Sequence, residues 1–193
     1  MKLWIMDLDN IKALCEGGDL YASNYDYANA ILCWSLAAED NADHEGKYRL
    51  GICYYEGKGV KQDMFSAISW LNKASQSGSF KAARILGSYY ENLAYSIDER
   101  EVSATDSQLA IWDVPRIEKT KILTYPECLN NAIEYYSQYL INIDAYVHWD
   151  NWQEIGFNLK KKSRKIIDSN MANELKIEKL KRLIRTYEGY EDA

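Results

Sequence analysis

The chain has 193 residues, of which 47% are hydrophobic and 27% are charged, and it contains only two prolines. This composition excludes a disordered or collagen-like chain and provides enough apolar surface for a continuous core. The net charge of -6 argues against a nucleic-acid-binding protein, since clustered Lys and Arg make the phosphate contacts in such proteins. The charge is uneven: residues 1–157 hold 13 Lys and Arg against 23 Asp and Glu, whereas residues 158–193 hold 10 against 6.

The first twelve residues lack the cationic run and apolar segment of a signal peptide, and no later window has the roughly 18 apolar residues of a membrane span. We therefore expect a cytoplasmic protein. The four cysteines, Cys15, Cys33, Cys53 and Cys128, form no C-x-x-C pair, and each lies within an apolar helical pattern. Buried, reduced thiols are their expected state.

Apolar residues recur at intervals of three and four through most of the chain, which predicts a succession of helices. Asp26 and Asp63 are good N-caps, Asn170 fits a further N-cap, and Pro126 fits the first position of a helix. We predict four consecutive antiparallel pairs of helices: 4–16 with 25–39, 43–56 with 64–77, 79–92 with 126–142, and 150–167 with 171–188.

The two central pairs are related by an internal repeat. Leu50, Gly51 and Tyr54 return 36 residues later as Leu86, Gly87 and Tyr90. A second helix type begins at Asp63, and its pattern recurs after Asp26 and around Ala132. Because small residues let the two helices of a pair approach closely, and no pair buries its apolar face alone, such pairs must stack on one another.

Residues 50–90 contain the motifs L-G-x-x-Y, G-x-G-V, D-x-x-x-A and W-x-x-K-A. In these motifs the stretch resembles the SLR (Sel-one-like repeat) family, whose members are related to tetratricopeptide repeats. The resemblance implies an all-α fold, a right-handed α/α solenoid of about four helix-turn-helix repeats. It also implies a concave side, lined by the first helix of each pair, that binds proteins. We expect one such domain over residues 1–193.

The third pair carries an insert at residues 93–125, where the chain has roughly 29 residues more than the equivalent turn of the second pair. Loops of this length either have a function or serve only as connections. One reading is a contact arm for a partner, and the other is a loop that packs back over the solenoid. The contact arm would use these acidic and aromatic residues: Asp98, Glu99, Glu101 and Trp112.

No pattern supports catalysis, a cofactor or a metal. Gly57–Val60 lacks the strand and the G-K-[ST] ending of a phosphate loop, and residues 7–10 lack the glycine and glutamate of a calcium loop. His44 and His148 have no metal-ligand spacing. The lysine run at 160–162 suits the C-terminal end of a helix better than nucleic acid or a membrane. We therefore expect a protein that is not an enzyme, with no cofactor and no small-molecule substrate.

Candidate partner-binding residues follow from helix geometry. When Gly51, Gly87 and Gly156 are placed at the contacts within each pair, the opposite faces of the first helices carry a defined set of side chains. The set comprises Glu45, Tyr48, Tyr55, Glu56, Lys81, Arg84, Glu91, Asn92, Asp150, Gln153, Lys160 and Lys161. Tyr and Arg are favoured anchors of binding energy, but solvated positions with no binding role would show the same pattern.

We interpret the chain as a small adaptor or inhibitor that holds one protein partner. A narrower version is an immunity protein that neutralises a basic bacterial toxin with its acidic surface. The alternative is a scaffold subunit that stacks on another copy, which exposed apolar area on the first or last helix would favour.

Overall fold

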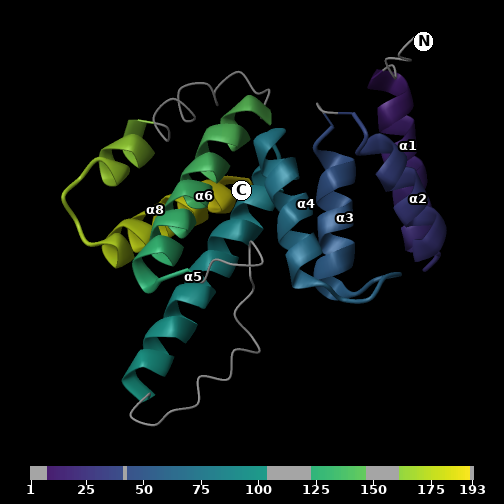
Figure 1. Cartoon of the computed structure of the whole chain (residues 1–193). Coiled ribbons are helices and arrows are strands. Elements are labelled where there is room, and N and C mark those ends of the chain that lie inside the picture. Colours follow the sequence, from purple (N-terminus) through teal and green to yellow (C-terminus); the bar gives the residue numbers. More distant parts are fainter. Residues whose placement is uncertain (1–7, 41–42, 104–122, 147–160, 192–193) are drawn as a thin grey trace, which may run out of the picture. The chain divides into compact units, whose positions relative to one another are not determined.

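The computed structural model describes residues 8–40, 43–103, 123–146 and 161–191, and it describes the backbone alone at 8, 98–103, 143–146 and 187–191. The chain divides into two compact units, Met1–Ala82 and Ala83–Ala193, and each is described by itself. Every regular element in the described residues is a helix, which confirms the predicted all-α class (Figure 1). One continuous domain over 1–193 stays a prediction.

The first unit consists of two helical hairpins and the start of a fifth helix. Its helices are α1 (Leu8–Ser23), α2 (Tyr27–Ala37), α3 (Glu45–Glu56) and α4 (Met64–Gln76). Helix α1 packs on α2, α2 on α3, and α3 on α4, in the purple and blue part of Figure 1. Each helix therefore contacts its neighbours in the sequence, which is the arrangement of an α/α solenoid.

Side-chain caps and glycine turns set the ends of these helices. The Asp26 carboxylate accepts a hydrogen bond from the first turn of α2, and the Asp63 carboxylate does the same for α4. Both predicted N-caps are thus confirmed. Between α3 and α4, Gly57 and Gly59 have φ angles of 73° and 72°, the left-handed region that glycine adopts without strain.

Helix α1 differs from its predicted range of 4–16. It begins at Leu8 and continues to Ser23, through Gly17 and Gly18, while residues 4–7 lie outside the described part. A Cβ atom added to Gly18 would lie 2.4 Å from Nε1 of Trp34 on α2. The glycine that weakens the helix is therefore also the residue that lets α2 approach it closely.

The same packing recurs in three hairpins, the third formed by α5 (Phe80–Ser103) and α6 (Tyr125–Tyr146). A glycine of the first helix meets a large side chain of the second, and that side chain comes four residues after an alanine that is 0% exposed. The three sets are Gly18 with Trp34 and Ala30, Gly51 with Leu71 and Ala67, and Gly87 with Tyr136 and Ala132. The predicted equivalence of Gly51 and Gly87 is confirmed, and Gly18 extends it.

The second unit contains most of α5 together with α6, residues 161–167 in helical conformation, and α8 (Asn173–Glu191). Helix α6 packs on α8. The buried residues of these two helices include Leu129, Leu140, Ile177 and Leu180, none of which is more than 2% exposed.

Helix α5 extends beyond its predicted end at residue 92. Leu93 and Ala94 continue the buried stripe begun by Tyr90, so the helix runs to Ser103. The first part of the predicted insert, 93–125, is therefore helical, and residues 104–122 lie outside the described part.

Two predicted helix starts in this unit also need correction. Pro126 is the second residue of α6 rather than the first, and Glu127 accepts a 2.9 Å hydrogen bond from the N–H of Thr124 in a capping-box arrangement. Asn170 is not the N-cap of α8, because that helix begins at Asn173. These errors arise because apolar periodicity locates a helix better than it locates its ends.

Candidate functional site

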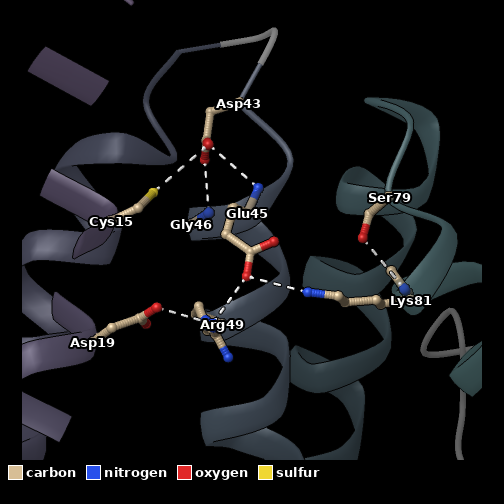
Figure 2. A network of polar contacts seen from close by, with 9 residues as sticks. Cys15, Asp19, Asp43, Glu45, Gly46, Arg49, Ser79 and Lys81 are labelled. Atoms are coloured by element: carbon tan, nitrogen blue, oxygen red, sulfur yellow. Dashed lines mark hydrogen bonds and ion pairs between the residues drawn. The ribbon is translucent and has the colours of Figure 1, made fainter. Parts of the chain in front are cut away.

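A network of charged side chains links three helices of the first unit (Figure 2). Nη2 of Arg49 on α3 lies 2.9 Å from Oδ2 of Asp19 on α1 and 3.1 Å from Oε1 of Glu45, one turn earlier on α3. The same Glu45 oxygen lies 3.9 Å from Nζ of Lys81 on α5. Two acidic and two basic side chains thus alternate across the first helices of successive pairs.

Tyr48 lies among these charges. The guanidinium carbon of Arg49 is 5.9 Å from the centre of its ring, and the ammonium nitrogen of Lys81 is 5.8 Å from it. The ring is half-buried, and this burial raises the pKa of the Tyr48 hydroxyl above its usual value. We call Asp19, Glu45, Tyr48, Arg49 and Lys81 the Tyr48 surface.

Buried polar contacts fix the helix ends that carry this surface. The Asp43 carboxylate is 8% exposed and accepts hydrogen bonds from the N–H groups of Glu45 and Gly46, at 3.3 and 2.9 Å. The Cys15 thiol donates to the same carboxylate, at 3.9 Å. Ser79 caps α5, because its hydroxyl accepts from the Ala82 N–H. These hydrogen bonds therefore hold the first turns of α3 and α5, which carry charged groups of the Tyr48 surface.

The other two candidates on α3 lie at its opposite end. Tyr55 is exposed, and Glu56 forms an ion pair with Lys58 in the following turn. Neither contacts the Tyr48 surface through a described hydrogen bond or ion pair. The partner-binding role predicted for both stays a prediction.

The candidates on α5 differ in exposure. Arg84 is exposed, whereas Glu91 is only 7% exposed. Glu91 accepts hydrogen bonds from the Tyr136 hydroxyl, at 2.8 Å, and from Nζ of Lys181, at 2.9 Å. Because both carboxylate oxygens are used inside the second unit, Glu91 joins α5, α6 and α8 there. Glu91 is buried because α6 and α8 cover this face of α5.

Of the remaining candidates, Asn92 and Lys161 are exposed, and the others cannot be placed by their side chains. Asp98, Glu99 and Glu101 lie in the part of α5 where the backbone alone is described. Trp112 and Gln153 lie outside the described residues, as do His148, Asp150 and Lys160.

Two members of the Tyr48 surface were not among the predicted residues. Arg49 follows Glu45 by four positions, the spacing at which opposite charges pair on a helix, so the sequence contained a signal for it. Asp19 gave no such signal, because its partner lies thirty residues away in the sequence and only the packing of α1 beside α3 brings them together.

Within the described part of the chain, no cluster of three or more His, Cys, Asp or Glu side chains is arranged to hold a metal ion. Of the helices described, none combines the length and the apolar character that crossing a membrane requires. The features that the structure does bring together are ion pairs, aromatic rings and closely packed hairpins.

Successive helical hairpins with an equivalent glycine contact in each define a helical-repeat protein. Residues 44–79 match the model of the Sel1 repeat family. Residues 44–79 therefore form a Sel1 repeat, as the resemblance of residues 50–90 predicted. Repeats of this family generally serve as protein–protein interaction modules.

The chain is also similar to a solved structure, described as the crystal structure of a Sel1 repeat protein from Oxalobacter formigenes. The sequence identity is 18% and the TM-score is 0.41, and the match covers 86% of this chain and 78% of that one.

Proposed function

We propose that this chain binds a protein partner through the Tyr48 surface. One observation carries the proposal: two cationic groups lie within 6 Å of the centre of one aromatic ring, and both cations pair with Glu45. Tyr and Arg are enriched among residues that dominate binding energy. Side chains that are ordered before binding lose less conformational entropy in the complex, so the arrangement favours a strong contact.

The charge of the chain supports a narrower form of this proposal, in which the partner is a basic protein and the chain inhibits it as an immunity protein inhibits a toxin. Residues 1–157 contain ten more acidic than basic side chains, 23 against 13. An acidic body attracts a basic partner over distances of about one Debye length, roughly 8 Å at physiological salt. It would accelerate the encounter, while the Tyr48 surface would supply short-range contacts.

The test begins with a partner captured by the tagged full chain, identified by mass spectrometry and then purified. Binding of this partner is measured by calorimetry with wild-type protein and with Tyr48→Ala. Loss of a central tyrosine anchor should weaken the affinity by on the order of tenfold or more. For a basic partner, the association rate should also fall steeply as salt is raised from 50 to 300 mM.

Tyr95→Ala is the matched control, because Tyr95 is an exposed tyrosine of α5 outside the Tyr48 surface. Its affinity should stay within about twofold of wild type, since most surface positions contribute little. Far-ultraviolet circular dichroism checks that both variants fold. If Tyr48→Ala binds as tightly as Tyr95→Ala, the partner uses another surface and the proposal fails.

A second candidate function, self-association as a scaffold subunit, is favoured by exposed apolar side chains on the first hairpin. Leu20 is 66% exposed, and Leu32 and Leu36, one turn apart on α2, are 62% and 47% exposed. Tyr21 and Tyr25 are also exposed. An apolar face of this kind is typical of a contact with another protein surface.

Light scattering coupled to size-exclusion chromatography separates this candidate from the first. Self-association through α2 predicts a stable oligomer that Leu32→Ser with Leu36→Ser converts to a monomer. A wild-type chain that is monomeric at 100 μM would rule out this candidate and leave the Tyr48 surface unaffected.

A further inference from the structure

A cleft opens on the first unit at a place that shares no residue with the Tyr48 surface. It has a volume of about 460 Å³ and is lined by Ala38, Lys47, Trp70, Lys73, Gln76 and Ser77. Lys47 and Tyr48 are consecutive residues of α3, so their side chains leave the helix about 100° apart. The cleft therefore faces α2 and α4, whereas the Tyr48 surface faces α1 and α5. Its size is within the usual range of roughly 300–1,000 Å³ for ligand sites.

Lys47 forms the inner wall of this cleft. The residue is only 6% exposed, and its ammonium group donates to the backbone oxygen of Asp40, at 2.7 Å, and to the Ser77 hydroxyl, at 3.2 Å. Burial lowers the pKa of Lys47, and the charges of Asp43 and Asp40 oppose that shift. Neither of these carboxylates lines the cleft. A fixed cationic group thus stands at the back of the cleft.

Lys73 and Trp70 form the outer wall, one turn apart on α4. The Lys73 ammonium nitrogen lies 4.3 Å from the centre of the Trp70 ring. Among the described residues, no carboxylate lies within ion-pair distance of Lys73, and its side chain is exposed. The positive charge of Lys73 also lowers the pKa of Lys47, which means that the two cations act on the same region.

The charge around the cleft indicates which kind of ligand it can bind. Its lining holds two cations and no anion, and it lies beside the C-terminal ends of α2 and α4, each equivalent to roughly half a negative charge. Asp43 and Asp40 act on Lys47 from outside the lining and reduce the positive charge further, so one singly charged carboxylate matches the cleft better than a doubly charged phosphate. The lining also offers an aromatic face for methylene groups and the amide of Gln76 as a donor.

We propose that this cleft binds the carboxylate of an acidic side chain in a segment of a protein partner. The carboxylate accepts hydrogen bonds from Lys73 and Gln76, Lys47 attracts it from behind, and the methylenes of the acidic side chain lie on the Trp70 ring. The cleft would give the chain a second contact, on a different face from the Tyr48 surface. This proposal depends on the proposed function in one respect, because the acidic side chain belongs to a protein partner.

The experiment uses the full chain and a peptide in place of the partner. The probe is N-acetylated, C-amidated triglutamate, and the matched control peptide is triglutamine with the same ends. Binding is followed by the indole N–H resonance of Trp70 in ¹⁵N-tryptophan-labelled protein, which Trp70→Phe assigns. Triglutamate should shift this resonance saturably and triglutamine should not, and 300 mM salt should weaken the binding because charged contacts are screened.

Variants locate the contact within the cleft. Lys73→Gln should weaken triglutamate binding about tenfold, as expected for one charge-assisted hydrogen bond. Lys73→Arg should retain most of the affinity. Lys61→Gln removes an exposed lysine of the same hairpin that does not line the cleft, and it should bind like wild type.

A Trp70 resonance that does not respond to triglutamate would overturn the proposal. So would an equal response to triglutamine, or a loss of affinity in Lys61→Gln as large as that in Lys73→Gln. Because no partner protein is present in this titration, its failure leaves the Tyr48 surface untouched. Conversely, an inactive Tyr48 surface would not change the response to the peptide.

Discussion

The indole ring of Trp34 lies directly against the backbone of Gly18, with no room for a Cβ atom between them. Trp34 is 3% exposed and packs with Ala30, Leu50 and Cys53 in one core cluster. Its Nε1 atom is buried without a hydrogen-bond partner among the described residues. Close packing of the ring must therefore offset an unpaired N–H group, which costs roughly 1–3 kcal/mol.

Replacing Gly18 should test this relationship. Alanine normally stabilises a helix by about 1 kcal/mol relative to glycine. In Gly18→Ala, however, the new Cβ would lie 2.4 Å from Nε1 of Trp34, so the ring or α1 must shift. We expect a net loss of about 1–3 kcal/mol in the free energy of unfolding, measured by urea denaturation.

The adjacent residue provides the control for Gly18→Ala. A Cβ atom at Gly17 would have no neighbour within 4 Å, so Gly17→Ala should gain stability, by up to about 1 kcal/mol. The two substitutions are chemically identical and lie one position apart on α1. If both shift the urea midpoint in the same direction, the close contact between α1 and α2 does not determine stability.

The buried carboxylate of Glu91 gives a second prediction. Tyr136→Phe removes the 2.8 Å hydrogen bond to this carboxylate while keeping the ring that packs against Gly87. A hydrogen bond to a charged group contributes about 1.5–3 kcal/mol, and we expect a loss of that size in the free energy of unfolding. Tyr95→Phe, at an exposed tyrosine of the same unit, should change it by less than about 0.5 kcal/mol. Equal effects would show that the Tyr136 hydroxyl is not paired.

Stability should fall in alkaline solution. Burial raises the pKa of Tyr135 to about 12 and the pKa values of Cys53 and Cys128 to about 11, and it also raises those of Tyr48, Tyr90 and Tyr136. Above pH 9 for the thiols and pH 10 for the phenols, the unfolded chain releases protons that the folded chain keeps. Stability is therefore fully present below these values and declines as the pH rises, by up to about 1.4 kcal/mol per group and pH unit.

Thermal unfolding between pH 7 and pH 11 measures this decline, and Tyr135→Phe identifies one contribution. The variant removes one half-buried phenol, so its melting temperature should fall less steeply above pH 10 than that of the wild type. A melting temperature that is constant from pH 8 to pH 11 would contradict the direction of these pKa shifts.

The thiols should differ in reactivity toward a disulfide reagent at pH 8. Cys15, Cys53 and Cys128 are buried, and the pKa of Cys15 is raised to about 12, first by burial and then by Asp43. Cys33 is half-buried. Because the thiolate is the reacting species and must be reachable, we expect one rapid reaction that Cys33→Ser abolishes. Rapid reaction of all four thiols in native conditions would show that the packing around them opens readily.

The repeat pattern predicted the central hairpin well, since Asp63, the Gly57–Gly59 turn and the contact glycine Gly51 all have local signals. Helix ends were less accurate. Gly17 and Gly18 were expected to follow the end of α1, yet the helix continues through them, and Trp34 packs against the second of these glycines. The end of α1 depends on tertiary packing, which the local sequence does not reveal.

The candidate site was predictable only in part. Helical spacing identified Glu45, Tyr48 and Lys81, which lie together. The same reasoning selected Glu91, because spacing on a helix reveals which residues share a face but not what covers that face. Asp19 joins the surface through a contact between helices distant in sequence, and only the folded structure shows such a contact.

The turn between the two helices of a hairpin is a natural place to add sequence. Gly87 meets Tyr136 much as Gly51 meets Leu71, although residues 104–124 lie between α5 and α6 and only residues 57–63 lie between α3 and α4. Added length at this point therefore leaves the hairpin contact in place. A protein engineer could use the turn at Gly57–Gly59 in the same way, as a position for grafting a binding loop onto the second hairpin.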